Sequence, residues 1–354
     1  MLMERLIFSF ITTLSLTFVI IPSLVKIAKE KNLYDNPNER TSHKGLVPRL
    51  GGLAFYVALV FSLSFWFNFS DYPQMQYIIA AMTVTTFVGL KDDLIGLSAF
   101  HKLMGQLFAA MVIVIWGGIR ITSLYGIFGV YELPEIISVI FTIFTVLVIV
   151  NAFNLIDGIN GLSGSIALIA SLTFGIWFYL LDPHAPMAFL AFSLVGVLTA
   201  FLRFNLSPAQ IFMGDTGSLL LGIVISVLAI QFIEMNGNIE TQYTLQSGPA
   251  IAMGIIIYPL FDLLRSFSIR IAKGHSPLRA DRNHIHHLLL DNGLSHDAST
   301  SIIVLFNILI ITIVFVFDDL GIYFLGAIIV ALSLIFVFLL KFFIKKRKKK
   351  STTL

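Results

Sequence analysis

The segment "EIISVIFTIFTVLVIVNAFNLIDGING", residues 135–161, joins a long apolar run to a cluster of amides and one acid. A run of about 20 mostly apolar residues is long enough to cross a bilayer as one helix, which predicts a span over 135–153. Asn151, Asn154 and Asp157 recur at every third position, so on a helix they lie along one side of the end of that span. Amides at that depth are not expected to face lipid, so this side is predicted to face other helices or a ligand. The alternative for Asp157 is a helix cap before a glycine turn.

The whole chain has the composition of an integral membrane protein. Of its 354 residues, 57% are hydrophobic and 12% are charged, and the mean hydropathy is +0.91. A soluble domain has about 45–50% apolar and about 25% charged residues. The sequence contains no cysteine, which excludes disulfide bonds, a thiol nucleophile and a cysteine-based zinc site.

Apolar segments of spanning length recur along the chain, and they predict an all-α fold: a polytopic membrane helix bundle with about 10–11 transmembrane helices. We expect one integral membrane domain over 1–344 and a basic tail over 345–354. The first segment is interpreted as a retained span and not as a signal peptide, because it lacks an Ala-x-Ala-like site. The eleven candidate segments are 5–25, 51–69, 77–90, 101–119, 135–153, 162–181, 187–204, 216–233, 248–268, 300–317 and 321–344.

The placement of Lys and Arg predicts the orientation of the chain. Alternate loops, beginning with 26–50, carry 21 of the 23 basic residues, and the other set carries only Arg5 and Arg120. By the positive-inside rule the N-terminus lies outside and the C-terminus is cytoplasmic. The basic character, with a pI near 9.0, then reflects loops that face an anionic membrane surface, so no nucleic-acid partner is expected.

The predicted cytoplasmic loops gather acids, amides, histidines and glycines. In "FMGDTGSLLLG" Asp215 stands between glycines at the start of a span, where a helix N-terminus favours anions and glycines let a phosphate approach the backbone. A carboxylate beside such a site is a natural Mg²⁺ ligand, because Mg²⁺ is usually held by one or two carboxylates and substrate phosphates. The alternative is that Asp215 is only an N-cap, with Thr216 and Ser218 satisfying the first-turn amides.

Two adjacent acids occupy the predicted inner loop "VGLKDDLIGL", residues 88–97. On a helix Asp92 and Asp93 point about 100° apart, so we expect them to have different tasks. One is predicted to face the ligand, and the other to orient a lysine or complete the metal shell. A solvated loop is the alternative. In another span, Asp262 and Arg265 have the spacing of a structural ion pair.

The predicted inner loop "GHSPLRADRNHIHHLLL", residues 274–290, combines three histidines with Arg279 and Arg282. The spacing does not match a familiar zinc site. Histidine and arginine together suit phosphate contacts. On a helix His284 and His287 share a face, while His286 is expected to point elsewhere and to serve packing.

Together these motifs resemble the polyprenyl-phosphate N-acetylhexosamine-1-phosphate transferase family, and most closely its undecaprenyl-phosphate N-acetylglucosamine-1-phosphate transferases. The resemblance runs from "HKGLVPRLGG" to "HIHH", about 41–290, and five motifs occur in the family order. "HSPLRADRNHIHH" is similar to the histidine loop of the N-acetylglucosamine branch, although Ala280 stands where proline is expected. The muramoyl-pentapeptide branch typically carries a different histidine run there.

The resemblance implies roles for individual residues, and these are carried over motif by motif. "KDDLIG" is similar to the paired-aspartate motif, "NAFNLIDGING" to the Asn-x-x-Asn-x-x-Asp-Gly motif, and "MGDTGS" to the metal-binding segment. The residues expected to be catalytic are Asp92, Asp93, Asp157 and His287. Those expected to bind substrate are Lys44, Lys102, Asn151, Asn154, Arg279, Arg282, His284 and His286, and Asp215 is the expected metal ligand.

The reaction that the resemblance implies is attack of a polyprenyl phosphate on the β-phosphorus of a UDP-sugar, with Mg²⁺ or alternatively Mn²⁺ as cofactor. The expected enzyme is a sugar-1-phosphate transferase, of the phosphotransferase type. Its predicted substrates are UDP-N-acetylglucosamine and undecaprenyl phosphate, with a muramoyl-pentapeptide or another UDP-sugar donor as the alternative. We expect it in the bacterial inner membrane, with the active site on the cytoplasmic face, at the first membrane step of a cell-envelope polysaccharide. The oligomeric state stays open between monomer and homodimer.

Two other classes of function compete with this interpretation. A secondary transporter would use Asp92, Asp157 or Asp262 as ion sites, but transporters place such sites near the bilayer midplane and contain internal repeats. The acids here stand mostly at the ends of spans, and the sequence shows no repeat. An inactive lipid-binding scaffold is not expected to keep the whole set of motifs.

Overall fold

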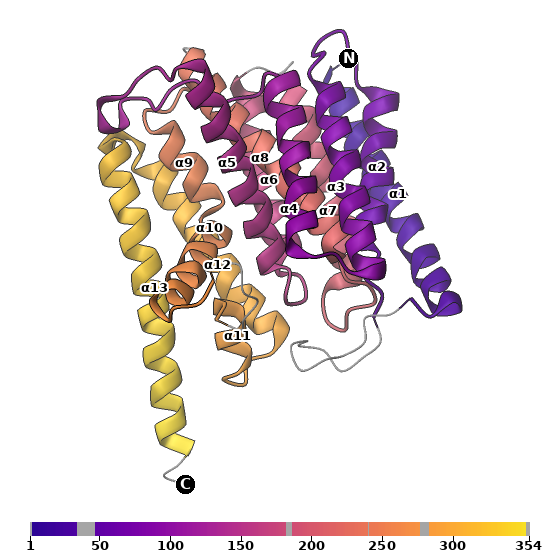
Figure 1. The fold of residues 1–354 in the computed structure, drawn as a ribbon, viewed down its shortest axis with the longest axis vertical. Coiled ribbons are helices and arrows are strands. Elements are labelled where there is room, and N and C mark those ends of the chain that lie inside the picture. Colours follow the sequence, from indigo (N-terminus) through magenta and orange to yellow (C-terminus); the bar gives the residue numbers. More distant parts are fainter. Residues whose placement is uncertain (1, 34–46, 182–185, 240, 277–282, 352–354) are drawn as a thin grey trace.

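The computed structural model describes residues 2–33, 47–181, 186–239, 241–276 and 283–351, and this part of the chain forms a bundle of helices (Figure 1). No strand occurs within these ranges, apart from an isolated bridge between Ser123 and Glu132. The helices are α1 (Leu2–Lys31), α2 (Gly51–Trp66), α3 (Met75–Ile95), α4 (Ala99–Met111), η1 (Val112–Trp116), η2 (Ile127–Gly129), α5 (Glu135–Ile156), α6 (Leu162–Leu181), α7 (Pro186–Asn205), α8 (Gly214–Asn238), α9 (Gly248–Ile255), α10 (Ile257–Ala272), α11 (Ile285–Leu290), α12 (His296–Val316), η3 (Asp318–Leu320) and α13 (Ile322–Ser351).

All eleven predicted spans are helical, so the prediction of an all-α membrane bundle is confirmed. Among the described residues, eight helices are long and apolar enough to cross a membrane, and the bent pair α9 and α10 would make a ninth. Helix α2 is apolar but shorter, and helix α3, which ends in the paired acids, is not among these candidates. The last helix continues to Ser351, so it extends through most of the predicted basic tail.

Helix α8 is the central element of the bundle. It packs against α2, α3, α5, α6 and α9, and most of its residues are buried. Few of the described side chains of α13 are buried, so this helix lies at the periphery of the bundle. A helix that is apolar all round and buried all round serves as a fixed scaffold, and Asp215 stands in its first turn.

The ninth predicted span is interrupted. Helices α9 and α10 meet at Ile256 with an 80° bend, although the sequence suggested one straight helix over 248–268. Asn307 of α12 compensates the break: its side chain accepts from Tyr258 N at 3.2 Å and donates to Ile255 O at 3.0 Å. Broken helices are tolerated in membranes where neighbouring side chains satisfy the freed backbone groups in this way.

Two glycines allow α2 and α3 to approach the start of α8 closely. A Cβ at Gly89 of α3 would lie 2.5 Å from Thr216 Cα, and a Cβ at Gly52 of α2 would collide with the backbone of Gly217. Gly52 N also donates to Met213 O at 2.9 Å. These contacts hold the acidic end of α3 against the first turn of α8.

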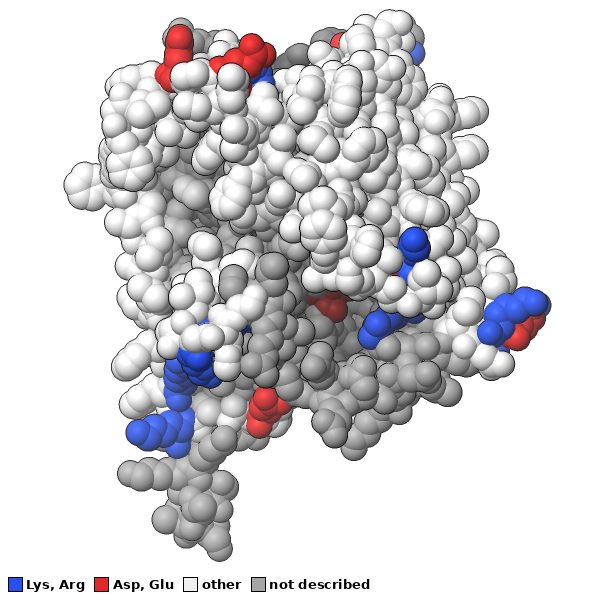
Figure 2. All heavy atoms as spheres, in the orientation of Figure 1, with Lys and Arg blue, Asp and Glu red and all other residues white. Residues whose placement is uncertain are grey.

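Charged side chains lie at the two ends of the bundle. In the face shown in Figure 2, a broad uncharged band separates acidic groups and a few basic atoms at the upper edge from Lys, Arg and acidic groups in the lower part. The start of α1 and the end of α13 lie at opposite ends of the bundle (Figure 1). This arrangement fits the prediction that the two termini lie on opposite sides of the membrane, while the assignment of the lower end to the cytoplasm stays a prediction.

Candidate active site

The Lys102 ammonium group joins the polar residues of four helices. It is the fourth residue of α4, after the N-cap Ser98, and its Nζ is 2.5 Å from Asp215 Oδ2 of α8 and 3.2 Å from Asp92 Oδ2 of α3. It also donates to Asn154 Oδ1 of α5 at 3.1 Å. The paired-aspartate, Asn-x-x-Asn-x-x-Asp and Gly-Asp-Thr-Gly motifs therefore meet at one point, as the sequence predicted.

Asp215 is held by partners on both of its carboxylate oxygens. Lys102 contacts Oδ2, and Asn154 Nδ2 donates to Oδ1 at 2.5 Å. The same Asn154 amide donates to Ser218 Oγ at 2.8 Å, which fixes its orientation. Asn154 thus positions the acid that the sequence predicted as the metal ligand.

Asp93 caps the N-terminus of α8. Its Oδ1 accepts from Asp215 N at 2.9 Å, and its Oδ2 accepts from Thr216 N at 2.9 Å and from Thr216 Oγ1 at 2.6 Å. The place where a substrate anion was expected to dock on the helix end therefore holds a carboxylate of the protein itself. The alternative in which Thr216 and Ser218 satisfy these amides does not hold, because the acceptor comes from α3. As predicted from their positions on a helix, Asp92 and Asp93 have different partners.

Asn151 pairs with a glutamine that sequence analysis did not single out. Its Nδ2 donates to Gln106 Oε1 at 2.8 Å and to Leu147 O at 2.8 Å. Gln106 is buried and follows Lys102 by four residues on α4, so both face the same side. The spacing of four residues between Lys102 and Gln106 was the sequence signal that could have placed Gln106 at the site.

Asp157 follows the last residue of α5 and differs from the other acids. Among the described residues, no group donates a hydrogen bond to its half-buried carboxylate. Burial raises the pKa of Asp157 well above its ordinary value, and the negative charges of Asp215 and Asp93 raise it further. Arg49, which sequence analysis overlooked, is the nearby cation that opposes this shift. Asp157 is therefore placed to accept a ligand.

The three histidines of the predicted loop form one cluster. Ring centroids of His284 and His286 are 5.6 Å apart, and those of His286 and His287 are 4.3 Å apart. The expectation that His286 points away is wrong, because His284 is the extended N-cap of α11 and does not lie within the helix. His286 instead lies against the Asn-Asn-Asp motif: a Cβ at Gly158 would be 2.5 Å from its Nε2.

A buried acid, Asp262, forms hydrogen bonds with His284 and with the start of α11. Asp262 of α10 bonds His284 Nδ1 at 2.7 Å and accepts from Ile285 N at 2.9 Å. Arg265 lies 3.9 Å from Asp262 and donates to Asn283 O at 2.5 Å. The pair predicted to be structural thus fixes the start of α11, and with it the direction of the histidines.

Three of the predicted substrate-binding residues lie outside the described part of the chain. They are Lys44, Arg279 and Arg282.

The donors at the meeting point of the motifs suit a Mg²⁺ ion, although no cluster of three or more His, Asp or Glu arranged to hold a metal occurs in the described ranges. Mg²⁺ does not require such a cluster, because waters and substrate phosphates usually complete its shell. Asp92 and Asp215 already share one cation, the Lys102 ammonium. Their carboxylates therefore point at a common position for positive charge.

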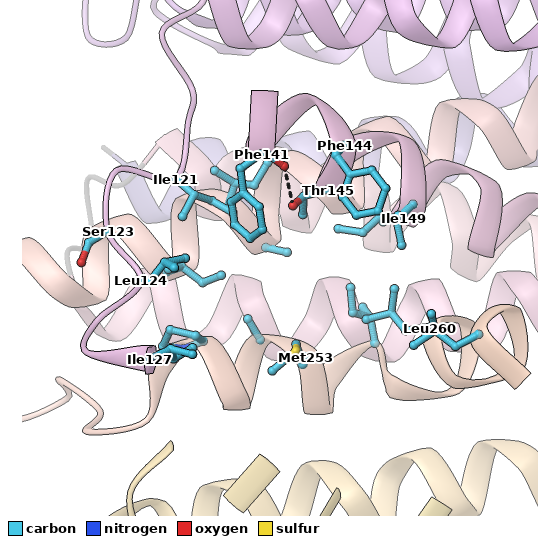
Figure 3. Close-up of a pocket in the computed structure, with 18 residues that line it drawn as sticks. Ile121, Ser123, Leu124, Ile127, Phe141, Phe144, Thr145, Ile149, Met253 and Leu260 are labelled. Atoms are coloured by element: carbon cyan, nitrogen blue, oxygen red, sulfur yellow. Dashed lines mark hydrogen bonds between the residues drawn. The ribbon is translucent and has the colours of Figure 1, made fainter. Parts of the chain in front are cut away.

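An apolar groove of about 380 Å³ lies between α5 and the bent pair α9 and α10 (Figure 3). Phe141, Phe144 and Ile149 of α5 lie on one side, and Met253 and Leu260 lie on the other. Nearly all of its lining is apolar, so it suits a hydrocarbon chain and not a polar ligand.

Comparison with known proteins gives a consistent result. Residues 75–233 match the family described as glycosyl transferase family 4. A protein of Bacillus subtilis (strain 168) named probable undecaprenyl-phosphate N-acetylglucosaminyl 1-phosphate transferase is 31% identical over 312 residues, which cover 86% of this chain and 82% of the relative. The undecaprenyl-phosphate alpha-N-acetylglucosaminyl 1-phosphate transferase of Escherichia coli (strain K12) is 30% identical over 279 residues, covering 76% and 72%. The protein of that name from Yersinia pestis is 28% identical, covering 82% and 77%.

Proposed function

This chain belongs to glycosyl transferase family 4, and we propose that it transfers N-acetylglucosamine-1-phosphate from UDP-N-acetylglucosamine to undecaprenyl phosphate. It is a membrane enzyme of the sugar-1-phosphate transferase type. The products are undecaprenyl-diphosphate-N-acetylglucosamine and UMP. The observation that carries the proposal is the meeting of the three acidic motifs at Lys102, in a chain about 30% identical to relatives with this name.

The acceptor lipid is assigned to the apolar groove between α5 and the bend of α9 and α10. The groove combines apolar lining from Phe144, Met253 and Leu260 with a position beside α5, the helix that ends in the Asn-Asn-Asp motif. A polyprenyl chain in this groove would direct its phosphate to the polar end of α5. The reaction then takes place at the ends of the spans and not at the bilayer centre.

The chemistry requires two anions to approach each other. A phosphate monoester has a second pKa of about 6, so the acceptor is largely dianionic at neutral pH and a strong base is unnecessary. In the net reaction an acceptor oxygen forms a bond to the β-phosphorus, and the bond between that phosphorus and the bridging oxygen breaks, releasing UMP. We assign Asp157 to the reacting phosphates, because no described residue donates to its carboxylate.

The remaining residues receive supporting roles. We assign Asp215 and Asp92 to Mg²⁺, with Mn²⁺ as an alternative, and a cation held there would screen the diphosphate charge. Asn154 positions Asp215, and Asp93 positions the start of α8. We assign His286 and His287 to the departing nucleotide phosphate, where Arg279 and Arg282 of the same loop would add positive charge.

The cellular setting follows from the same proposal. The basic-residue asymmetry supports a cytoplasmic position for the end of the bundle that carries the site. Bacterial relatives and the apolar helices support the bacterial plasma membrane. The proposed product would begin a cell-envelope polysaccharide.

A donor comparison tests the proposal. Purified protein in lipid nanodiscs would receive undecaprenyl phosphate, Mg²⁺ and one UDP-sugar at a time, and released UMP and lipid-linked sugar would be quantified together. We expect the highest kcat/KM with UDP-N-acetylglucosamine. Transfer of only phospho-N-acetylmuramoyl-pentapeptide would contradict the donor, and absence of transfer from every donor would contradict the activity. Asp215→Asn is the inactive control.

A further inference from the structure

We propose that Lys102 is an exchangeable counter-ion: its ammonium group holds Asp92 and Asp215 together in the metal-free site, and a divalent cation displaces it. This inference rests on the proposed function, which supplies the divalent cation.

The first step of the argument is the position of the ammonium group. Lys102 Nζ lies 2.5 Å from Asp215 Oδ2 and 3.2 Å from Asp92 Oδ2, so it occupies the point at which both carboxylates converge. A divalent cation bound by these oxygens would need the same point. Two cations cannot share it, because their repulsion at such separations is large in a partly buried site.

The second step is the charge balance around this point. Four carboxylates gather here, those of Asp92, Asp93, Asp157 and Asp215, and the described cations that interact with them are Lys102 and Arg49. Removing Lys102 without replacement would leave Asp92 and Asp215 facing each other uncompensated. The metal-free protein therefore needs the lysine for stability, and the metal-bound protein does not.

The third step is the freedom of the lysine to move. Its ammonium is held by side chains only, and Asn154 Oδ1 at 3.1 Å is a partner that it can keep after leaving Asp215. The Lys102 side chain is 17% exposed, so it is not sealed inside the bundle. A flexible four-carbon stem and a compact ammonium suit this exchange better than a planar guanidinium would.

Two opposite effects follow for Lys102→Met, which keeps the stem and removes the charge. Without metal, the variant should unfold at a lower temperature than the parent protein. Its affinity for Mn²⁺ should rise by at least about tenfold, because the competing charge is gone from a partly buried site. A lysine that only binds substrate would leave metal affinity unchanged.

The experiment measures metal binding without substrate. Protein in nanodiscs would be titrated with Mn²⁺ and followed by electron paramagnetic resonance of the free ion, with the Mn²⁺-induced shift in unfolding temperature as a second readout. Lys91→Met is the matched control, because Lys91 is exposed on α3 and its removal changes net charge equally. We expect tighter Mn²⁺ binding and a larger thermal shift for Lys102→Met, and parental behaviour for Lys91→Met.

Every other outcome of the Mn²⁺ titration also decides whether the exchange takes place. Equal or weaker Mn²⁺ binding by Lys102→Met, or binding to neither protein, would overturn the exchange. Equal gains in both variants would also overturn it, because the effect would then be one of net charge. Tighter binding in Lys102→Met together with absence of sugar-phosphate transfer in the parent would keep the exchange and refute the proposed reaction. If the parent protein transfers the sugar phosphate but Lys102→Met gains no affinity for Mn²⁺, the proposed reaction stands and the exchange is refuted.

Discussion

At the scale of single residues, Asp157 carries an energetic cost that the fold alone does not explain. Its carboxylate is half-buried beside two other acids, and no described residue donates a hydrogen bond to it. Such groups are common where a protein gives up stability for function. Asp93 shows the opposite arrangement, because all three of its hydrogen bonds serve to fix the start of α8.

Asp157→Asn is expected to inactivate the enzyme and to stabilise it. Because the pKa of Asp157 is raised in the folded state, folding favours its neutral form, and this contribution is lost as pH rises through the raised pKa. Asparagine stays neutral, so without metal the variant should unfold at a higher temperature at neutral pH, and the difference should shrink in acid. Transfer should fall by at least about 10²-fold, the scale of a lost catalytic group.

Thermal unfolding of the purified proteins between acid and neutral pH, with a chelator present, measures this effect. Asp297→Asn is the control: Asp297 is exposed in the first turn of α12, where an anion favours the helix dipole, so its removal should bring no gain. A neutral-pH loss of stability in Asp157→Asn would contradict the assignment of a strained, ligand-ready carboxylate.

At the scale of elements, the site depends on the start of α8 and on the contact between α5 and α11. Asp93 should act through α8 and not through substrate. Asp93→Ala leaves the amides of Asp215 and Thr216 without their acceptor and should destabilise the protein by about 1–2 kcal/mol. Turnover should fall by about 10²-fold, because a small displacement of Asp215 is enough to do so.

Asp93→Asn distinguishes this positioning role from direct catalysis. Asparagine keeps one acceptor for the helix end, so it should recover part of both the stability and the turnover, and KM for the nucleotide sugar should change little. Chemical denaturation and steady-state kinetics on the three proteins supply the comparison. If the Asn variant were as inactive as the Ala variant while fully stable, Asp93 would have to act on the substrate itself.

The contact between Gly158 and His286 offers a test of the histidine cluster. A Cβ at Gly158 would lie 2.5 Å from the Nε2 atom at the far end of the His286 ring, so Gly158→Ala should displace that ring and leave the fold intact. We expect each of Gly158→Ala and His286→Ala to lower kcat, and the double variant to be no worse than His286→Ala. A double-mutant cycle on kcat measures this coupling, and strictly additive losses would show that Gly158 acts elsewhere.

Sequence patterns predicted the helices better than the contacts between side chains of different helices, and the reason is physical. Every apolar run became a helix, because lipid forces a spanning segment to satisfy its backbone internally. The break at Ile256 was missed, because Asn307, which compensates it, belongs to another helix. The Asp93 cap joins residues 122 positions apart in sequence, and no local spacing reports such a contact.

At the scale of the whole molecule, the absence of cysteine allows the orientation to be measured directly. Ser276→Cys, after α10, and Ser70→Cys, between α2 and α3, are exposed positions on predicted opposite sides of the membrane. In intact cells an impermeant thiol reagent should label only the cysteine at 70, and permeabilised cells should label both. Labelling of the cysteine at 276 in intact cells would place the candidate active site on the outer face.

The architecture as a whole joins an apolar groove to a polar site at one end of α5. The groove has almost no polar lining, and the acids of the site lie at and beyond the end of α5. The central claim is therefore that this site moves a phosphorus atom together with its sugar onto a membrane lipid.

The fate of the β-phosphorus tests that claim most directly. UDP-N-acetylglucosamine labelled with ³²P at the β-position would be incubated with undecaprenyl phosphate, Mg²⁺ and the purified protein, and the lipid and aqueous phases would be separated. We predict that the label enters the lipid together with the sugar, in equal amount to the UMP released, and that Asp215→Asn abolishes this transfer. Sugar in the lipid with the label left in aqueous UDP would show a glycosyl transfer without phosphate and would contradict the account.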